Sequence, residues 1–516
     1  MDTTIKNLLI IGLLFLLPAC EDKIDPLVEE LQFERVFSPL ELKAQIRNKT
    51  TVELTWNVRD DAEAYMVEIS EDNFATITKT ATVAPDELPY SAALIGETQY
   101  AARVKGTAEA LEDSKWSVVT FLTEPENILE RLAGLDIQAN SVTLKWPAGS
   151  ELTNFIIMPG NTTRAITTEE KAAGTATITG LTGETEYTVR LMKDTKQRGT
   201  LTFTTYVDPT NATAVTHTDD LNAVIGAAAE GDVLVLWPGD YTVYTGTVIL
   251  NKSIAIKGLY PYDKPIIHVQ FNLENNVQAV LIKDVEMDGS TTLSNAFQHN
   301  SAGAFGSLDV IRCNIHDYGK SLFANTSSSN KASIASITMD NCLVTNILTD
   351  GGDGIDYRSS YVAQLTLKNS TFNNCAPARD FIRFDDASAT FPGMISNVLI
   401  DHCTLYGVSN GTSRRILYVR FKTNTLTVTN TIIGATAGYY TNQTNSAQPE
   451  CANNNYFNAP GFVTGGSTVS GAKFDLSGTH SLLDPGFADA ATGDFTLSNQ
   501  ALIDNQIGDP RWITAP

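Results

Sequence analysis

Apolar and polar residues alternate along short stretches of residues 38–124, with the period of a half-buried β-strand. Examples are "VELTW", "AYMVEIS" and "WSVVTFLT". Residues 127–206 repeat the pattern in "VTLKWP", "NFIIM" and "LTFTT". Turn residues separate these stretches, so the pattern predicts two small β domains in tandem.

Residues 208–516 follow a different pattern, which opens with one amphipathic segment. Four apolar residues have helical spacing and a glycine follows as a stop signal: Leu221, Val224, Ile225, Ala228 and Gly231. We therefore expect a helix near 219–229, followed by short strands. Such a helix would cover the open end of a stacked sheet.

An internal repeat runs through the same region. One column of the aligned segments contains Val285, Cys313, Cys342, Ser370, Cys403 and Thr431, at spacings of 28, 29, 28, 33 and 28 residues. A near-constant period made of short β-rich runs predicts one coil rung per repeat, with rungs about 4.8 Å apart. The preceding column reads Asp284, Arg312, Asn341, Asn369, His402 and Asn430. Asn suits a rung corner, so we interpret this column, His402 included, as structural.

The two tandem domains resemble fibronectin type III domains. The matching positions of the first are Leu54, Trp56, Tyr65, Val67, Leu94, Thr98, Tyr100, Val104 and Phe121. Those of the second are Trp146, Leu181, Thr185, Tyr187 and Val189. This resemblance implies sandwiches with the aromatic side chains between two sheets, used as spacers or binding platforms.

The third region strongly resembles the pectate-lyase-like right-handed β-helices. Its tail, "LLDPGFADAATGDFTLSNQALIDNQIGDPRW", resembles the closing segment of Bacteroidetes β-helix proteins related to chondroitinase B and alginate lyases. The expected fold class is all-β, with two fibronectin type III-like sandwiches at 38–124 and 127–206. A right-handed parallel β-helix with an N-terminal cap helix and a C-terminal cap follows at 208–516.

The first residues indicate a targeting signal rather than a part of the folded domains. "NLLIIGLLFLLPAC" is too short for a confident membrane span and ends in a small residue and a cysteine. It resembles a bacterial lipoprotein signal, which implies residues 1–20 as signal peptide, Cys20 as the lipidated residue and 21–37 as a linker. Glu21 and Asp22 resemble the surface-export signal of Bacteroidetes lipoproteins. We expect a lipid-anchored, surface-exposed protein of the outer membrane, acting with other surface glycan-uptake proteins.

The net charge of −23 argues against a nucleic-acid partner. An acidic polymer would need a local basic patch or a bridging cation. Five cysteines follow Cys20, and none lies in a CxxC pair, so a zinc site is a poor interpretation and small buried side chains are expected.

Such a basic patch is predicted on one wall of the β-helix. If Ile355, Ile382 and Leu417 face inward, the intervening residues face outward. That strip carries Asp356, Arg358, Arg383, Asp385, Tyr418, Arg420 and Lys422, with Lys320 near the same wall. Residues 356–422 hold eight Lys and Arg against five Asp. Guanidinium groups match carboxylates, so the expected ligand is an acidic, uronate-containing polysaccharide.

The resemblance implies β-elimination as the candidate reaction, which needs a neutralised carboxylate and a base. Arg383 and Lys320 are the candidate bases. Substrate-binding groups are expected to be Arg358, Arg379, Tyr418, Arg420 and Lys422. Replacement of Arg383 by alanine should then impair binding and barely change folding, as for an exposed pair.

Calcium is an open alternative for neutralising the carboxylate. "TDGGDGID" is an acidic, Gly-rich loop, so Asp353, Asp356 and Asp385 are candidate oxygen ligands for Ca²⁺. A solvated turn is the competing interpretation.

Several rival functions stay open at this point. Arg and Asp on adjacent rungs would form mutually satisfied pairs, Arg358 with Asp385 for example, and serve structure alone. Two further alternatives to a lyase are a non-catalytic surface glycan-binding protein and a structural adhesin. A glycoside hydrolase using paired carboxylates is disfavoured by the interleaved arginines.

Overall fold

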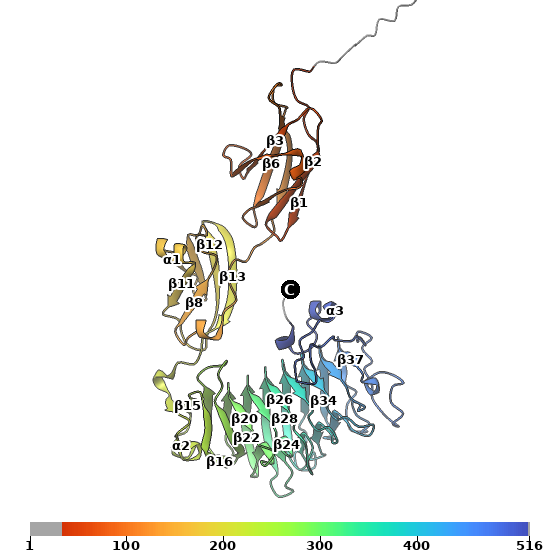
Figure 1. Cartoon of the computed structure of the whole chain (residues 1–516). Coiled ribbons are helices and arrows are strands. Elements are labelled where there is room, and N and C mark those ends of the chain that lie inside the picture. The colour runs from red at the N-terminus through yellow and green to blue at the C-terminus, as the bar shows by residue number, and fades with distance from the viewer. Residues whose placement is uncertain (1–32, 514–516) are drawn as a thin grey trace, which may run out of the picture.

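The structure is a computed structural model that describes residues 33–513. The predicted all-β class is confirmed: two β-sandwiches precede a long parallel β-helix (Figure 1). Cys20 and the expected signal peptide lie outside the described residues. None of the helices between residues 33 and 513 has the length and apolar character needed to cross a membrane.

The first sandwich packs a three-stranded sheet (β1-β2-β5) on a four-stranded one (β4-β3-β6-β7). Its strands are β1 Leu40–Arg47, β2 Thr51–Asn57, β3 Ala64–Ser70, β4 Lys79–Val83, β5 Tyr90–Ala93, β6 Gln99–Thr107 and β7 Ser117–Leu122. The alternating residues Leu54, Trp56, Tyr65 and Val67 are buried between the sheets. The hydroxyl oxygen of Tyr100 accepts a hydrogen bond from the backbone N–H of Ile95, the corner contact of this sandwich architecture.

The second sandwich is built from sheets β10-β9-β12-β13 and β11-β8. Its elements are β8 Ser141–Lys145, β9 Asn154–Met158, β10 Thr162–Ala165, α1 Thr168–Ala173, β11 Thr175–Thr179, β12 Glu186–Lys193 and β13 Lys196–Thr204. Trp146 and Tyr187 are buried, and Tyr187 accepts a hydrogen bond from the backbone of Thr182. The repeated sequence pattern therefore produces the same corner in both domains.

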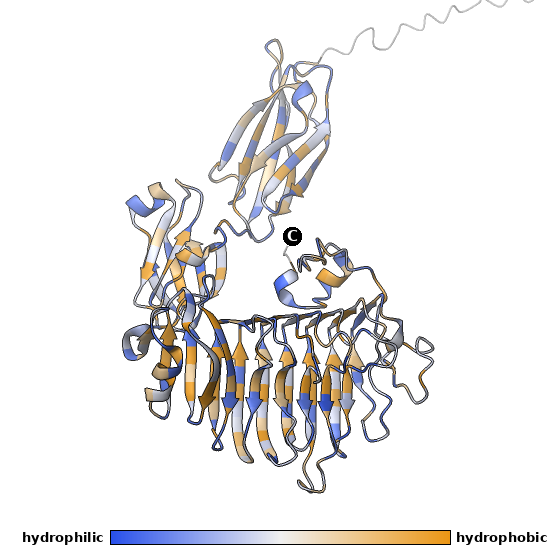
Figure 2. Cartoon of the chain, turned by 60° about the horizontal axis from the view of Figure 1, so that its bottom comes forward, coloured by the Kyte–Doolittle hydropathy of each residue, from blue (hydrophilic) through white to orange (hydrophobic). Residues whose placement is uncertain are grey.

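The central rungs of the β-helix each contribute a strand to each of three walls. The first wall is a ten-stranded parallel sheet: β14 Thr213–Val215, β15 Asp232–Leu236, β17 Ile254–Gly258, β19 Ala279–Lys283, β22 Gly303–Ile311, β25 Ala332–Asp340, β28 Tyr361–Lys368, β31 Ser396–Asp401, β34 Asn424–Thr429 and β36 Glu450–Ala452. Apolar and polar residues alternate along these strands (Figure 2). The alternation buries one face in the core.

Two strands of the first rungs are long and belong to two walls at once: β16 Asp240–Leu250 and β18 Ile266–Leu273. The start of β18 pairs with the second wall and its end with the third. The second wall consists of β20 Glu286–Asp288, β23 Asn314–His316, β26 Leu343–Thr345, β29 Thr371–Asn373, β32 Thr404–Tyr406, β35 Ile432–Gly434 and β37 Asn455–Phe457. The third consists of β21 Asn295–His299, β24 Ser321–Asn325, β27 Ile355–Tyr357, β30 Ile382–Phe384 and β33 Leu417–Val419.

The repeated columns mark the corner between the first and second walls. All six residues of the polar column have a positive φ, from 48° at His402 to 57° at Asp284. Asn tolerates this left-handed conformation best, which explains its prevalence there. The thiols of Cys313, Cys342 and Cys403 lie one residue further on, buried, each donating to backbone carbonyls. The five cysteines of residues 33–513 are free.

Separate segments cover the first rung and the outer face of the second wall. The helix α2 Leu221–Ala227 buries Leu221 and Ile225 in the core at the first rung. In the C-terminal region, the helix α3 Gln500–Asp504 buries Leu502 against Ile432 of the second wall, and the tail after it runs back along that wall. There Asp509 accepts a hydrogen bond from Thr371 at 2.7 Å, and Arg511 donates to the carbonyl of Asn341 at 2.7 Å.

The second sandwich contacts the first rungs. Glu184 pairs with Lys257, at 2.6 Å, and with Lys283. The ring of Tyr206 lies 6.2 Å from that of Tyr260 and 5.9 Å from that of Tyr262. This contact joins the sandwich to the N-terminal end of the β-helix (Figure 1).

Candidate functional site

The third wall presents the predicted strip. Ile355, Ile382 and Leu417 are buried in register, and the next residues, Asp356, Arg383 and Tyr418, are partners across β27, β30 and β33. Two residues further on come Arg358, Asp385 and Arg420. Alternation on three short strands therefore brings residues from three rungs onto one surface.

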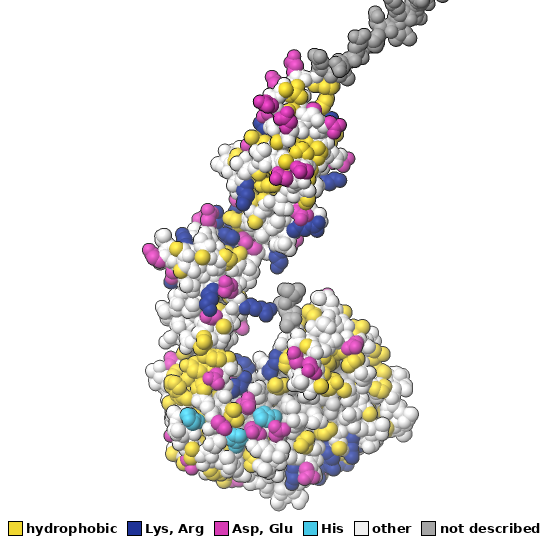
Figure 3. All heavy atoms as spheres, in the orientation of Figure 1, with side chains coloured by type: hydrophobic (Ala, Val, Ile, Leu, Met, Phe, Trp, Pro, Cys, Tyr) yellow, Lys and Arg dark blue, Asp and Glu magenta, His cyan; other side chains and the backbone are white. Residues whose placement is uncertain are grey.

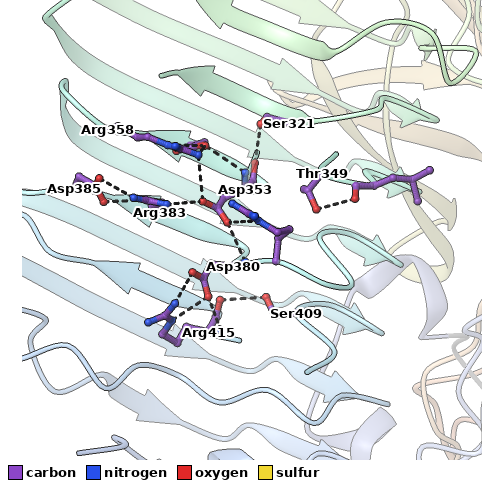
Figure 4. Close-up of polar contacts among 12 residues, drawn as sticks. Ser321, Thr349, Asp353, Arg358, Asp380, Arg383, Asp385, Ser409 and Arg415 are labelled. Atoms are coloured by element: carbon purple, nitrogen blue, oxygen red, sulfur yellow. Dashed lines mark hydrogen bonds and ion pairs between the residues drawn. The ribbon is translucent and has the colours of Figure 1, made fainter. Parts of the chain in front are cut away.

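Arg383 lies between two carboxylates (Figure 4). Its Nε and Nη2 donate to Asp385 Oδ1 and Oδ2, both at 2.9 Å, and its Nη1 donates to Asp353 Oδ2 at 3.1 Å. The hydrogen bonds to Asp385 raise the pKa of Arg383 above its already high ordinary value. This guanidinium is therefore poorly suited to accept a proton, contrary to the role that the sequence suggested for it.

Four more guanidinium groups near Arg383 are each paired with an aspartate as well. The closest nitrogen–oxygen distances are 2.7 Å for Arg358 and Asp356, 3.2 Å for Arg379 and Asp353, 2.8 Å for Arg415 and Asp380, and 2.7 Å for Arg420 and Asp385. We call Arg358, Arg379, Arg383, Arg415 and Arg420 the arginine cluster.

The carboxylates lie beneath these guanidinium groups. The side chains of Asp353, Asp356 and Asp380 are 2%, 0% and 5% exposed, whereas those of the arginine cluster are 17–35% exposed. Burial raises the pKa of Asp356 despite its bonds to Arg358. At Asp385 burial acts in the same direction, but hydrogen bonds from Arg383 and Arg420 outweigh it and lower the pKa.

This burial corrects one expectation. Arg383 does not form an exposed ladder pair, because its partner Asp353 is almost fully buried. Removal of one partner of a buried pair leaves a charge without compensation, which is costly. The expected pairing of Arg358 with Asp385 is also replaced, since Arg358 pairs with Asp356 of its own segment.

The proposed calcium ligands do not form an open set of oxygen atoms. Asp353, Asp356 and Asp385 each bind at least one guanidinium group. A calcium ion would have to displace these arginines, because it needs six to eight oxygen ligands around itself. The donor set therefore fits guanidinium groups and does not fit Ca²⁺.

Tyr418 is enclosed by cations. The guanidinium carbons of Arg415, Arg420 and Arg383 lie 3.9, 4.9 and 5.3 Å from its ring centroid. Such contacts orient guanidinium groups on an aromatic face. Tyr418 thus helps to position the arginine cluster, whereas the sequence suggested direct contact with a ligand.

A polar groove of about 560 Å³ continues from the arginine cluster over the earlier rungs. Its lining includes Gln270, Asn295, Gln298, Ser321, Lys320 and Arg358. Lys320 is exposed in this groove, while Lys422 is exposed beyond β33 and does not line it. Sequence reasoning missed the amides, although Gln270 and Asn272 alternate with apolar residues in "VQFNL".

Comparisons with known proteins leave the function of this surface undefined. A family model described as a domain of unknown function (DUF4957) matches residues 239–375, and a second so described (DUF5123) matches residues 398–512. No curated protein matches the chain.

Similar solved structures are tandem fibronectin domains. A two fibronectin type III domain segment from chicken tenascin is 17% identical, covers 32% of this chain and 97% of that one, and has a TM-score of 0.23. The central fibronectin III array of RIM-binding protein is 16% identical, with coverages of 34% and 63% and a TM-score of 0.15. The chain spans under two thirds of that array. These likenesses concern fold alone.

Proposed function

We propose that the protein binds an acidic, uronate-containing polysaccharide along the third wall of its β-helix. The observation that carries this proposal is the arginine cluster, held over buried carboxylates beside a polar groove. We further propose that it does so as a lipid-anchored surface protein of the Bacteroidetes type, with a β-helix related to those of pectate-lyase-like proteins.

The arrangement leaves donors available for a ligand. A guanidinium group has five N–H donors, and Arg383 uses three of them on Asp385 and Asp353. Carboxylates of a sugar polymer would bind the remaining N–H groups, because charge-assisted hydrogen bonds match this geometry. Pre-oriented guanidinium groups also lose little entropy on binding.

A second candidate is cleavage of the same polymer by β-elimination. Lys320 and Arg358 line one groove, which favours this candidate. Arg358 would neutralise the uronate carboxylate, and the uncharged Lys320 amine would take the proton from C5. The electron pair would form a C4–C5 double bond as the C4–O bond breaks, and the leaving oxygen would take up a proton.

Lys320 separates these two candidates. If Lys320 binds the polymer as an ammonium group, its replacement by alanine should weaken polyuronate binding by about 1.5–3 kcal/mol, the value of a charge-assisted contact. Any production of unsaturated uronate should fall at least about 100-fold, because a positioned base contributes that much. The measurements are calorimetric binding and ultraviolet absorbance with pectate, alginate and chondroitin.

Lys331→Ala is the matched control, because Lys331 is an exposed lysine that does not line the groove. Binding without any unsaturated product would identify a non-catalytic binding protein. If the unmodified chain binds none of the three polymers, the proposed function is wrong and an adhesin role gains support.

Surface anchoring depends on Cys20. Cys20→Ala should leave the precursor unprocessed and without lipid, because the thiol is the acceptor of the lipid in this signal class. The measurements are metabolic labelling with a fatty acid and protease treatment of whole cells. A wild-type protein that resists protease in intact cells would contradict surface display.

A further inference from the structure

A cluster of histidines and carboxylates lies on the outer face of the second wall, beside the polar groove, with which the hollow at His268 shares Thr292 and Leu293. Asp288 of β20 and His316 of β23 are partners in register. His268 of β18 lies on the preceding rung, with its Nδ1 3.5 Å from Asp288 Oδ2. Figure 3 shows histidine and acidic side chains together on the β-helix near the sandwich end.

Three of these side chains converge on a common point. The Nδ1 of His316 is 2.8 Å from Asp317 Oδ2 and 3.7 Å from Asp288 Oδ1. One ligand atom from each of Asp288, His316 and Asp317 lies within 4.8 Å of the others. Ligands around a tetrahedral Zn²⁺ lie about 3.4 Å apart, given bonds of about 2.0–2.1 Å. The two measured separations bracket that value.

Each histidine ring is held in one orientation by a carboxylate at its Nε2 atom, on the side away from the shared point. The Nε2 of His316 lies 3.4 Å from Glu286 Oε1, and the Nε2 of His268 lies 2.7 Å from Asp240 Oδ1. A carboxylate on Nε2 is the usual support of a metal-binding histidine. Without a metal, His316 Nδ1 donates to Asp317 Oδ2 at 2.8 Å, so a bound metal would replace that proton. In both histidines Nδ1 is the nitrogen that faces Asp288.

The carboxylates are fixed as well. Asp288 Oδ1 accepts a hydrogen bond from the backbone N–H of Ser290 at 2.6 Å. Asp317 Oδ1 accepts one from the side-chain amide of Asn346 at 3.1 Å. These bonds leave Asp317 Oδ2 directed at His316.

The charge of this cluster is unbalanced, in contrast to that of the arginine cluster. Among residues 33–513, the ion-pair partners of Asp240, Glu286, Asp288 and Asp317 are His268 and His316, with no lysine or arginine. The six side chains are 17–57% exposed. Hollows of about 300 Å³ beside His268 and 290 Å³ beside His316 give an ion access.

We propose that this cluster binds a divalent transition-metal ion such as Zn²⁺. His316 Nδ1, Asp288 and Asp317 are the ligands, Glu286 supports His316, and water completes the shell. Imidazole with carboxylates suits this class of ion. The ion would link two neighbouring rungs of the second wall, because Asp288 and His316 belong to different rungs.

The test is titration of the chelator-treated full chain with Zn²⁺ by calorimetry and with Co²⁺ by visible absorption. We expect one equivalent to bind, and His316→Ala and Asp288→Asn to weaken binding at least 100-fold. Glu286→Gln leaves every ligand in place and should weaken binding roughly 10-fold to 100-fold, as outer partners do.

His402→Asn is the matched control. His402 also pairs with an aspartate, Asp401, at 2.9 Å, but occupies the corner column in which Asn is the usual residue. The proposal is overturned if no ion binds at millimolar concentration or if His402→Asn abolishes binding. It is also overturned if Glu286→Gln and a folded His316 variant both bind like the wild type.

Discussion

Replacement of Arg383 by alanine is expected to lower the free energy of unfolding of the β-helix by about 3 kcal/mol. Loss of one partner of a buried ion pair costs about 3–5 kcal/mol, and the lower value applies because Asp353 keeps Arg379 and Asp385 keeps Arg420. Denaturant unfolding measures the effect. The same change should weaken polyuronate binding by about 1.5–3 kcal/mol, since it also removes two available N–H donors.

Lys368→Ala is the control for Arg383. Lys368 pairs with Asp340 at 3.2 Å on the first wall, but its side chain is 41% exposed, so its loss should cost about 1 kcal/mol or less. Equal effects of the two substitutions would show that solvent screens the arginine cluster. Destabilisation with unchanged binding would assign Arg383 to structure alone.

Phe297→Ala is expected to lower the free energy of unfolding by about 3–5 kcal/mol, the range for a buried aromatic side chain. Phe297 lies in the middle of a stacked column, with ring centroids 5.8 Å from Phe271 and 5.3 Å from Phe323. All three rings are buried on consecutive rungs. The cavity would therefore remove contacts to both neighbours at once.

Phe297→Leu is the matched control for the aromatic column. Leucine fills more of the site than alanine, so it should retain most of the stability. Thermal unfolding of both variants measures the difference. If Phe297→Ala unfolds like the wild type, the stacked column does not contribute to the core as the structure implies.

The architecture follows from local features of the sequence. Period-2 alternation predicts the strands of the sandwiches, and the spacing of the Cys313 column predicts the rungs. The corner column depends on single residues such as Asn341, whose preference for a positive φ is local. The inward direction of Ile355, Ile382 and Leu417 also follows from alternation. These features require no knowledge of distant contacts.

The partners of the charged side chains were decided by tertiary structure. Neighbours on adjacent rungs lie some 28 residues apart, and the segment 346–354 that delivers Asp353 has no repeating pattern. Alternation shows that Arg383 faces outward, yet the path of that segment places Asp353 beneath it and makes the pair buried. The same holds for His268, Asp288 and His316, which meet only because parallel strands stack in register. Local preferences define the rungs, whereas rung stacking and loop paths define which charges meet.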